Sequence, residues 1–330
     1  MYHYLMSIEQ VNLAISYDTE MPIESRIPAD FISKRTYSKL DMSGKKQAWI
    51  DYITKDLWKD PNFMRQSRNE LFTIKELGTL FSEFNGKLTS FVLGSWLDVI
   101  VEEFGHQKVT EPFSNSAIDI QSHSQNHKPY KTTVKEGALY ETQDSSVISN
   151  EIKASKDSIK KHLGVDVIGL RTPMGNITPF SEIEDIEILD ALKANNIKYV
   201  SSWLKSEQKK PNAISLETLP FYYDNGVLEI PGVSSYDVHN TQPTRMLLFN
   251  NTESWTEEQR TDYYIGELVN AQTLANHTDK NVFVPWVFHP ADVFMYDRNL
   301  DVHLDILEFC ESHDIGIISY TDIYDIIAKN

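Results

Sequence analysis

The stretch "HSQNH" at residues 123–127 contains two histidines four positions apart, which could bind a metal ion. Residues at positions i and i+4 meet on one face of a helical turn, a spacing that lets two imidazoles bind one cation. Taken alone the pair is a weak signal, because histidines at this spacing are also typical of surface positions and hydrogen-bonded loops. His123 and His127 are therefore candidate metal ligands that need support from elsewhere in the chain.

A pair of carboxylates supplies part of that support. Asp18 and Glu20 stand two positions apart, directly after the apolar run "NLAISY". If the strand geometry persists, alternate residues point to the same face, so both carboxylates would face the same side. An acidic pair that closes a strand and faces solvent is the simpler alternative.

Together these residues are typical of a hydrolytic metal site. Two histidines and one carboxylate leave open positions on a catalytic zinc ion, which lowers the pKa of a bound water to about 7. A second carboxylate could act as general base, and His289, just before a proline in "VFHP", could protonate the leaving group. Arg171, in "RTPMG", could hold the basic carboxylate by a bidentate contact. A buried, hydrogen-bonded histidine and a salt-bridged strand end are the structural alternatives for these two residues.

The elements that must position these residues alternate in type along the chain. Short apolar runs rich in β-formers, such as "VNLAISYD", "KLTSFVLG" and "AIDIQSH", are separated by longer helical patterns such as "LFTIKELGTLFSEF" and "SWLDVIVEEFG". The rhythm continues to "IGIISYTDIYDII" and predicts βα units with a largely parallel sheet or barrel, in which the carboxyl ends of the strands converge. The residues that close or follow apolar runs are Asp18, Glu20, His123, His127, Arg171, Trp203 and His289.

We expect one domain over residues 1–330, because no composition break, low-complexity linker or internal repeat divides the chain. The segment at about 27–68 fits the rhythm least well. It is polar and rich in lysine, carries Trp49 and Trp58, and is interpreted as an insertion that packs on the barrel or shapes a cleft. The one cysteine, Cys310, lies on an apolar helical pattern and is expected to be buried.

The bulk composition disfavours two classes of protein. A formal charge of −17 argues against binding to nucleic acid, which depends on clustered Lys and Arg. No run of about eighteen apolar residues is present, so no membrane span is expected. The start "MYHYLMSIEQ" lacks the basic region and cleavage site of a secretory signal, so we expect a cytoplasmic protein, or an extracellular or cell-envelope one if a leader has been removed. The oligomeric state is not indicated.

The ordered set of motifs resembles the polysaccharide deacetylase family, the NodB-homology or carbohydrate esterase family 4 group. "HSQNH" is similar to the family's histidine motif H-[ST]-x-x-H, "RTPMG" to its arginine motif R-x-P-x-G, and "VPWVFHP" to its late strand that ends in histidine. "KLTSFVLG", "LDALKANNIKYVSSW" and "VLEIPGVSSYD" are similar to further family segments. The resemblance runs from about Val11 to Ile327 and implies an α/β fold, an irregular (β/α) barrel of about seven parallel strands.

The resemblance also implies an activity. Members are metal-dependent hydrolases that remove N-acetyl groups from amino-sugar glycans such as peptidoglycan or chitin-like polymers. It implies His123 and His127 as ligands of a divalent metal, with Zn²⁺ the expected ion, His289 as catalytic acid and Arg171 as the residue that orients the base. The residues expected to contact the carbohydrate substrate are Trp203, Pro173 and Trp286.

The first motif departs from the family's usual "TFDDG". Thr19 stands where the second Asp, the usual metal ligand, is expected, and Glu20 fits a variant with the acidic residue two positions after the base. We therefore expect Asp18 to be the base and Glu20 the third metal ligand. The "SSW" stretch at 201–203 also departs from the family's D-x-x-D-W element, which puts the family's arginine and tryptophan support network in question.

Three other functions stay open at this point. The first is hydrolysis of a small cyclic or linear amide on the same barrel. The second is a non-heme iron enzyme, since two histidines and one carboxylate also suit Fe(II), although such enzymes commonly use antiparallel folds. The third is a catalytically inactive relative that binds carbohydrate, which gains weight if Glu20 is not a ligand.

Overall fold

A curled, mostly parallel sheet forms the framework of the protein. The computed structural model describes residues 10–20, 61–135, 138–140, 142–176, 178–205, 214–233 and 256–329. The strands with parallel neighbours are β1 (Val11–Thr19), β2 (Leu88–Val92), β3 (Ile118–Ser122), β6 (Gly169–Asn176), β7 (Tyr199–Lys205), β9 (Leu228–Glu229), β10 (Gly232–Val233), β11 (Val282–Phe288) and β12 (Gly316–Ile317). Their order is β11-β1-β2-β3-β6-β7-β9, with β12 also paired to β1 and β10 also paired to β7.

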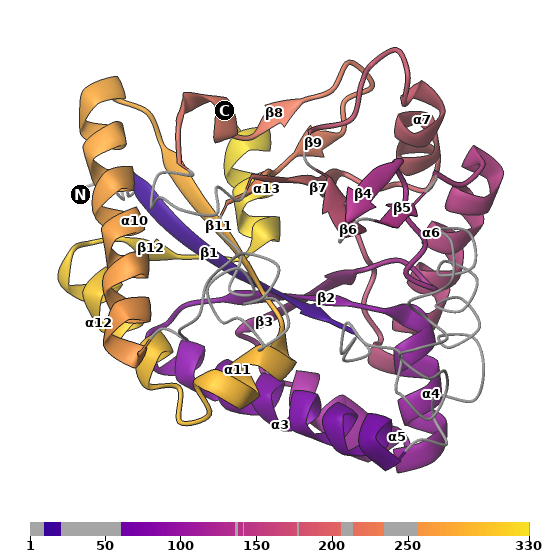
Figure 1. Ribbon diagram of the computed structural model, residues 1–330, viewed down its shortest axis with the longest axis horizontal. Coiled ribbons are helices and arrows are strands. Elements are labelled where there is room, and N and C mark those ends of the chain that lie inside the picture. Colours follow the sequence, from indigo (N-terminus) through magenta and orange to yellow (C-terminus); the bar gives the residue numbers. More distant parts are fainter. Residues whose placement is uncertain are drawn as a thin grey trace, which may run out of the picture.

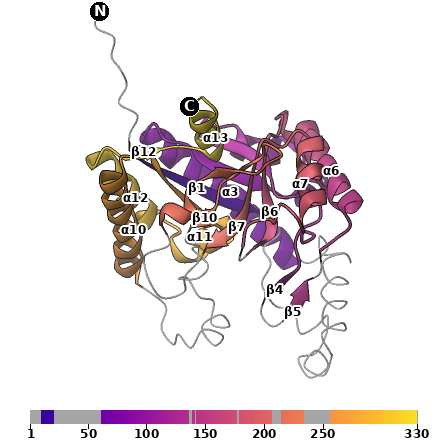
Figure 2. The same cartoon turned by 90° about the horizontal axis from the view of Figure 1, so that it is seen from above.

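Antiparallel pairing is confined, among the described residues, to two small places. Strand β8 (Phe221–Tyr222) pairs with β9 at the edge of the main sheet. Strands β4 (Thr133–Lys135) and β5 (Ala138–Tyr140) form a separate hairpin, which projects away from the main sheet in Figure 2. The largely parallel sheet predicted from the βα rhythm is therefore confirmed.

Helices cover the outer side of this sheet (Figure 1). In Figure 1 they surround the central strands, which include the indigo strand β1. They are α3 (Pro61–Glu83), α4 (Gly94–Phe104), α5 (His106–Thr110), α6 (Ser145–Leu163), α7 (Ile186–Ala194), α10 (Glu257–Thr278), α11 (Pro290–Tyr296) and α12 (Asp301–Ser312), with 3-10 turns at η2 (Glu111–Phe113) and η3 (Leu216–Thr218). A further helix, α13 (Tyr320–Ala328), lies on the inner side.

Strand β1 shows how the sequence pattern determines which side chains face inward. Its alternate residues Leu13, Ile15 and Tyr17 join the large apolar core, whereas Ala14 packs in a second cluster together with Tyr320 of α13. Because side chains alternate across a strand, Asp18 belongs with Ala14 and faces the inner side of the curled sheet.

Helix α13 packs against that inner side. A capping box starts the helix: Asp322 N donates to Ser319 Oγ over 3.1 Å, and Ser319 N donates to Asp322 Oδ2 over 3.0 Å. Tyr320 N also donates to Thr89 Oγ1 of β2 over 2.8 Å. These bonds fix the first turn of α13 and place the ring of Tyr320 among strand residues of the inner cluster, such as Phe91.

The two sides of the sheet approach each other, as in an irregular barrel. Strand β10 pairs with β7 but also lies against β11, since a Cβ added to Gly232 would come within 2.8 Å of Val287 Cγ2. The predicted α/β class with an irregular (β/α) barrel is confirmed. Within the described ranges, no helix combines the length and the apolar character needed to cross a membrane.

The segment expected to be an insertion falls mostly outside the described residues. Residues 27–60 lie outside them, while 61–68 form the beginning of α3. The end of the proposed insertion is thus part of a helix of the domain: Ser67 is fully buried and accepts a hydrogen bond from Trp96 Nε1 of α4 over 3.1 Å.

Cys310 is buried in α12, as the sequence predicts, and burial raises the pKa of its thiol well above the usual value. Because the thiolate is the reactive form, we expect no reaction with an aromatic disulfide reagent in the folded protein and one equivalent after denaturation. The absorbance of the released thiolate measures this, and Cys310→Ser provides the blank in both states. Reaction of the folded protein at the rate of a free thiol would contradict the burial.

Candidate active site

The candidate site lies where neighbouring parallel strands end. Strands β11, β1, β2, β3 and β6 are adjacent in the sheet, and parallel strands bring their carboxyl ends to one edge. Residues far apart in the sequence meet there. The predicted site residues on or just after these strands are Asp18 and Glu20 (β1), His123 and His127 (β3), Arg171 (the third residue of β6) and His289 (β11).

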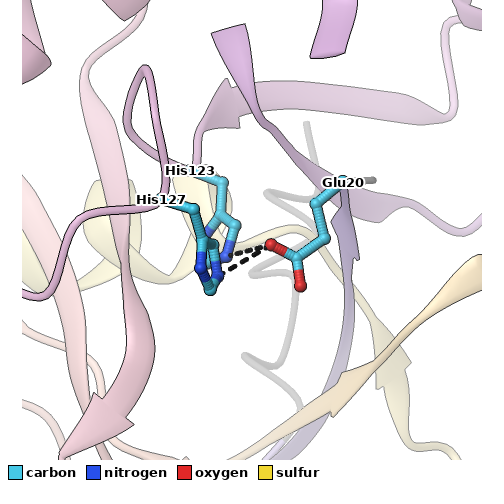
Figure 3. Close-up of side chains that lie close together, drawn as sticks. All are labelled: Glu20, His123 and His127. Carbon is cyan, nitrogen blue, oxygen red and sulfur yellow. Dashed lines mark ion pairs between the residues drawn. The ribbon is translucent and has the colours of Figure 1, made fainter. Parts of the chain in front are cut away.

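Glu20, His123 and His127 form a buried cluster. Glu20 Oε2 lies 2.8 Å from His127 Nε2 and 3.1 Å from His123 Nε2. One possible ligand atom from each residue lies within 4.8 Å of the other two. Figure 3 shows both imidazoles directed toward the same oxygen of the carboxylate. The structure therefore brings together the three side chains that the sequence analysis expects to bind a metal.

The backbone between the two histidines differs from the predicted helical turn. Residues 123–127, called here the histidine loop, follow β3 without helical structure. Ser124 and His127 have φ values of 68° and 54°, in the left-handed region that a right-handed helix excludes. The predicted turn is therefore wrong, although the two rings do meet, with centroids 5.1 Å apart.

The backbone of β6 orients the His123 ring. Its Nδ1 lies 3.1 Å from the carbonyl oxygen of Arg171. A carbonyl oxygen only accepts, so Nδ1 carries a hydrogen, and Nε2 of the neutral ring presents a lone pair toward Glu20. Histidines that bind metals almost always donate their other ring N–H in this way.

The atoms of the cluster fit a cation. Glu20 Oε2 is buried and has no partner in proper hydrogen-bond geometry, although two imidazole nitrogens lie within 3.1 Å of it. His127 Nδ1 is likewise buried without a hydrogen-bond partner. A carboxylate oxygen and two imidazole nitrogens are ordinary zinc ligands, and a shared ion accounts for the convergence of these three atoms. The donor set therefore suits a divalent metal.

The charges of the cluster point the same way. Burial by itself raises the pKa of Glu20, but His127 and His123 outweigh it and hold that pKa well below the usual range. Burial lowers the pKa of His123, while Asp18 and Glu20 raise it to a value above the ordinary one. The carboxylates thus favour positive charge on this side of the sheet, whether protons or a metal ion supply it.

Arg171 lies beside Asp18 but makes no bidentate contact with its carboxylate. Its Nε lies 3.6 Å from Asp18 Oδ1, while its Nη2 donates to Ser16 Oγ over 3.0 Å and to Tyr320 Oη over 2.9 Å. The guanidinium carbon also lies 5.1 Å from the centre of the Phe91 ring. The predicted bidentate contact is wrong because Ser16 and Tyr320 occupy the second nitrogen. The predicted neighbourhood of Arg171 and Asp18 is present.

His289 completes the group at its solvent side. Its Nε2 lies 3.4 Å from Glu20 Oε1, and its Nδ1 lies 3.7 Å from Asp292 Oδ2. The side chain is 26% exposed, in contrast to the buried ligand cluster. His289 stands at the N-cap of α11, directly before Pro290, so the end of β11 and the start of the helix fix its backbone. Such a residue can exchange protons with solvent and with a bound molecule.

Comparison with known families relates part of this arrangement to one family. The model of the polysaccharide deacetylase family matches residues 72–200. Over these residues the chain is similar to the polysaccharide deacetylase family. The matched part contains His123, His127 and Arg171, whereas the carboxylates of β1 and His289 lie outside it. No curated protein matches the chain significantly.

Solved structures share the fold along most of the chain. A putative polysaccharide deacetylase from Mycobacterium smegmatis aligns with a TM-score of 0.61 at 15% identity, over 98% of this chain and 92% of that one. A probable polysaccharide deacetylase from Pseudomonas aeruginosa PAO1 gives 0.54 at 12% identity, over 96% and 91%. The Puue allantoinase gives 0.52 at 13% identity, over 96% and 90%. Identities this low show the shared fold alone.

The residues expected to contact a carbohydrate occupy different environments in this deacetylase fold. Trp286 has no exposed surface, and its ring packs between Tyr264 and Phe288 at centroid distances of 4.7 and 6.2 Å. A ring without exposed surface offers no face to a substrate, so we assign Trp286 to the core. Pro173 is buried, and Trp203 is half-buried near the end of β7. Their contact with a substrate stays a prediction.

Glu70 is a carboxyl group near the site that the sequence analysis missed. It lies on α3, is 1% exposed, and its Oε2 has no hydrogen-bond partner. Burial raises the pKa of Glu70 well above its usual range, and the charge of Glu20 raises it further. The signal was present in the helical pattern, because the buried stripe of Ile74, Leu77 and Phe81 reaches Glu70 when extended by one turn.

Glu229 binds the stretch at 201–203, where the sequence departs from the family pattern. It is fully buried and accepts hydrogen bonds from Ser202 N at 2.8 Å, Ser202 Oγ at 2.7 Å, Trp203 N at 3.0 Å and Tyr223 Oη at 2.8 Å. A carboxylate from β9 therefore binds the middle of β7. Burial raises the pKa of Glu229, against the effect of these hydrogen bonds.

Gly232 leaves room for Arg171. A Cβ at this position would lie 3.0 Å from Arg171 Nη1 and 2.8 Å from Val287 Cγ2, closer than side chains pack. We expect Gly232→Ala to lower the free energy of unfolding by about 1–3 kcal/mol, because the added methyl overpacks the site. Denaturant unfolding measures this.

Gly266→Ala is the matched control for that substitution. Gly266 lies within α10, and a Cβ there would have nothing within 4 Å. Alanine should raise the free energy of unfolding there by about 0.5–1 kcal/mol, because it restricts the unfolded chain and favours the helix. A Gly232→Ala protein as stable as the Gly266→Ala protein would show that Arg171 is not confined as described.

Proposed function

We propose that the protein is a metal-dependent hydrolase that removes N-acetyl groups from an amino-sugar polysaccharide or oligosaccharide. The observation that carries the proposal is the buried cluster of Glu20, His123 and His127 on the fold of the polysaccharide deacetylase family. One carboxylate and two imidazoles leave coordination positions open, as catalytic zinc sites do, so we infer Zn²⁺ as the cofactor.

Asp18 is the general base of the proposed reaction. A divalent metal held by the cluster would supply a Lewis acid for the acetyl carbonyl and lower the pKa of a water molecule. Asp18 is 7% exposed and lies close enough to His123 to raise the pKa of that imidazole, so its carboxylate is within the site. It would accept the proton of the attacking water, while Arg171, held by Ser16 and Tyr320, orients it.

His289 is the general acid of the proposed reaction. The sugar amine departs when the amide C–N bond breaks, and it is a poor leaving group unless its nitrogen receives a proton during this step. His289 is the partly exposed imidazole beside the ligand carboxylate, so a substrate that enters from solvent can reach it. We propose that Trp203 and Pro173 contact the sugar.

Hydrolysis of a small cyclic amide is the second candidate. The likeness of the fold to the Puue allantoinase structure favours it, since that enzyme is named for a small cyclic amide, allantoin. The same base, acid and cluster would serve, because an amide C–N bond is again broken. The two candidates differ in the size of molecule that the site must admit.

An assay for released acetate tests the proposal. The protein is stripped with a chelator, reloaded with zinc or left without it, and incubated with chitooligosaccharides, N-acetylated peptidoglycan fragments or allantoin. We expect acetate from a glycan only after zinc has been restored. Loss of allantoin without acetate would favour the second candidate. No turnover of any substrate would contradict both enzymatic candidates and favour a carbohydrate-binding relative.

Asp18→Asn separates the base from the metal ligands. The amide cannot accept the proton of water, so we expect kcat to fall by about 10²–10⁴-fold while the zinc content stays at the level of the unsubstituted protein. Steady-state kinetics and elemental analysis of the same preparation measure both quantities. Loss of zinc from this variant would instead make Asp18 a ligand and reverse the roles of Asp18 and Glu20.

His123→Ala should remove both zinc and activity, since it leaves two protein ligands where catalytic zinc sites have three. His277→Ala is the matched control, because His277 is an exposed histidine on α10 whose Nδ1 contacts the carbonyl oxygen of Thr273 in its own helix. That variant should keep zinc and turnover. Full activity of His123→Ala would rule out the metal mechanism.

A further inference from the structure

The histidine loop has a strained backbone, which one bond within the loop supports: His127 N donates to Ser124 Oγ over 3.2 Å. Ser124 and His127 both lie in the left-handed region, at φ 68° and 54°, although neither is a glycine. Non-glycine residues adopt this region at an energetic cost and keep it only where surrounding groups impose it. The direction of the His127 ring therefore depends on whatever holds the loop.

The first turn of α4 holds the beginning of the loop. Gly94 N donates to Ser124 O over 3.0 Å, and Ser95 N donates to Gln125 O over 2.9 Å. A Cβ on Gly94 would lie 2.0 Å from Gln125 Oε1, so a larger residue there would have to displace the Gln125 side chain. These bonds end at Gln125 and do not reach the residue that precedes His127.

Glu151 of α6 holds the next residue, Asn126. Asn126 N donates to Glu151 Oε2 over 2.7 Å, and Asn126 Nδ2 donates to Glu151 Oε1 over 2.9 Å. Glu151 is 5% exposed, and Lys128 Nζ lies 3.2 Å from its Oε1. Hydrogen bonds to a carboxylate are stronger than those between neutral groups. Glu151 accepts one from the backbone and one from the side chain of Asn126.

The rest of α6 fixes Glu151 relative to the sheet. Ser155 Oγ lies 2.8 Å from Ser122 Oγ at the end of β3, one residue before His123. Ser158 Oγ donates to Asp98 Oδ1 over 2.8 Å, and Asp98 Oδ2 accepts from Gln125 Nε2 over 3.0 Å. Helix α6 therefore contacts Ser122, just before the histidine loop, and Asn126 within it. The contact of α6 that lies nearest to His127 is the one that Glu151 makes.

We propose that Glu151 is a positioning residue of the metal site, which holds His127 in its left-handed conformation through Asn126 and so directs its Nε2 toward Glu20. The inference rests on the metal site of the proposed function, not on the substrate. It makes Glu151 a determinant of metal affinity although its carboxylate does not touch the metal ligands.

Zinc affinity of the stripped protein tests the proposal, measured by competition with a chromophoric chelator. We expect Glu151→Ala to weaken zinc binding about 10–100-fold, the range seen when groups that orient metal ligands are removed. Glu151→Gln keeps one acceptor but turns an amide NH₂ toward a donor, so its affinity should lie between those of the alanine variant and the unsubstituted protein. Asn126→Ala should weaken binding as well, and adding it to Glu151→Ala should cost little more, because both remove the same contact.

Two controls separate positioning from general destabilisation. Asp157→Ala removes an exposed carboxylate from the same helix and should leave zinc affinity unchanged. Ile159→Val removes a methyl group from a fully buried residue of α6, which should lower the melting temperature without changing zinc affinity. If Glu151→Ala does not fold, Glu151→Gln and Asn126→Ala carry the test.

The outcomes distinguish this proposal from the proposed function. Zinc affinity of Glu151→Ala equal to that of Asp157→Ala would overturn the positioning role. Failure of the unsubstituted protein to bind zinc would overturn the metal site and this inference with it. Zinc binding without release of acetate would contradict the proposed substrate, while a weakened Glu151→Ala would still support the positioning role.

Discussion

A buried carboxylate that faces two imidazoles is the interaction on which the rest of the site depends. Glu20 is 6% exposed, and its Oε2 has no hydrogen-bond partner, so its charge must be balanced by positive charge inside the protein. His123 and His127 can supply that charge only as protonated rings or through a shared metal ion. The strands, the histidine loop and the helices behind it bring these three side chains together.

Much of this convergence could be predicted from the sequence. The βα rhythm predicts a parallel sheet, and in such a sheet side chains at strand ends meet whatever their separation in sequence. The alternation along β1 predicts that Asp18 and Glu20 share a face, and both are buried next to His123. The position of Arg171 beside Asp18 follows from the same topology.

The remainder depends on contacts between distant elements, which no local pattern encodes. The left-handed backbone at Ser124 and His127 is imposed by α4 and α6, so the predicted helical turn was wrong. The predicted bidentate contact between Arg171 and Asp18 was wrong because Arg171 Nη2 donates to Tyr320 of α13, about 150 positions along the chain. Trp286 was expected to contact the substrate, but its strand is buried on both sides, a property of the sheet rather than of the residue. Glu70 could have been found, since it lies on the buried stripe of its helix.

Anomalous diffraction at the zinc edge, from crystals of the zinc-loaded protein, tests the central claim most directly. The account predicts one strong peak, with a carboxylate oxygen of Glu20 and Nε2 of His123 and His127 at about 2.0–2.2 Å and the remaining coordination positions open to solvent. A peak elsewhere, no peak at these residues, or coordination by Asp18 with Glu20 turned away would contradict it.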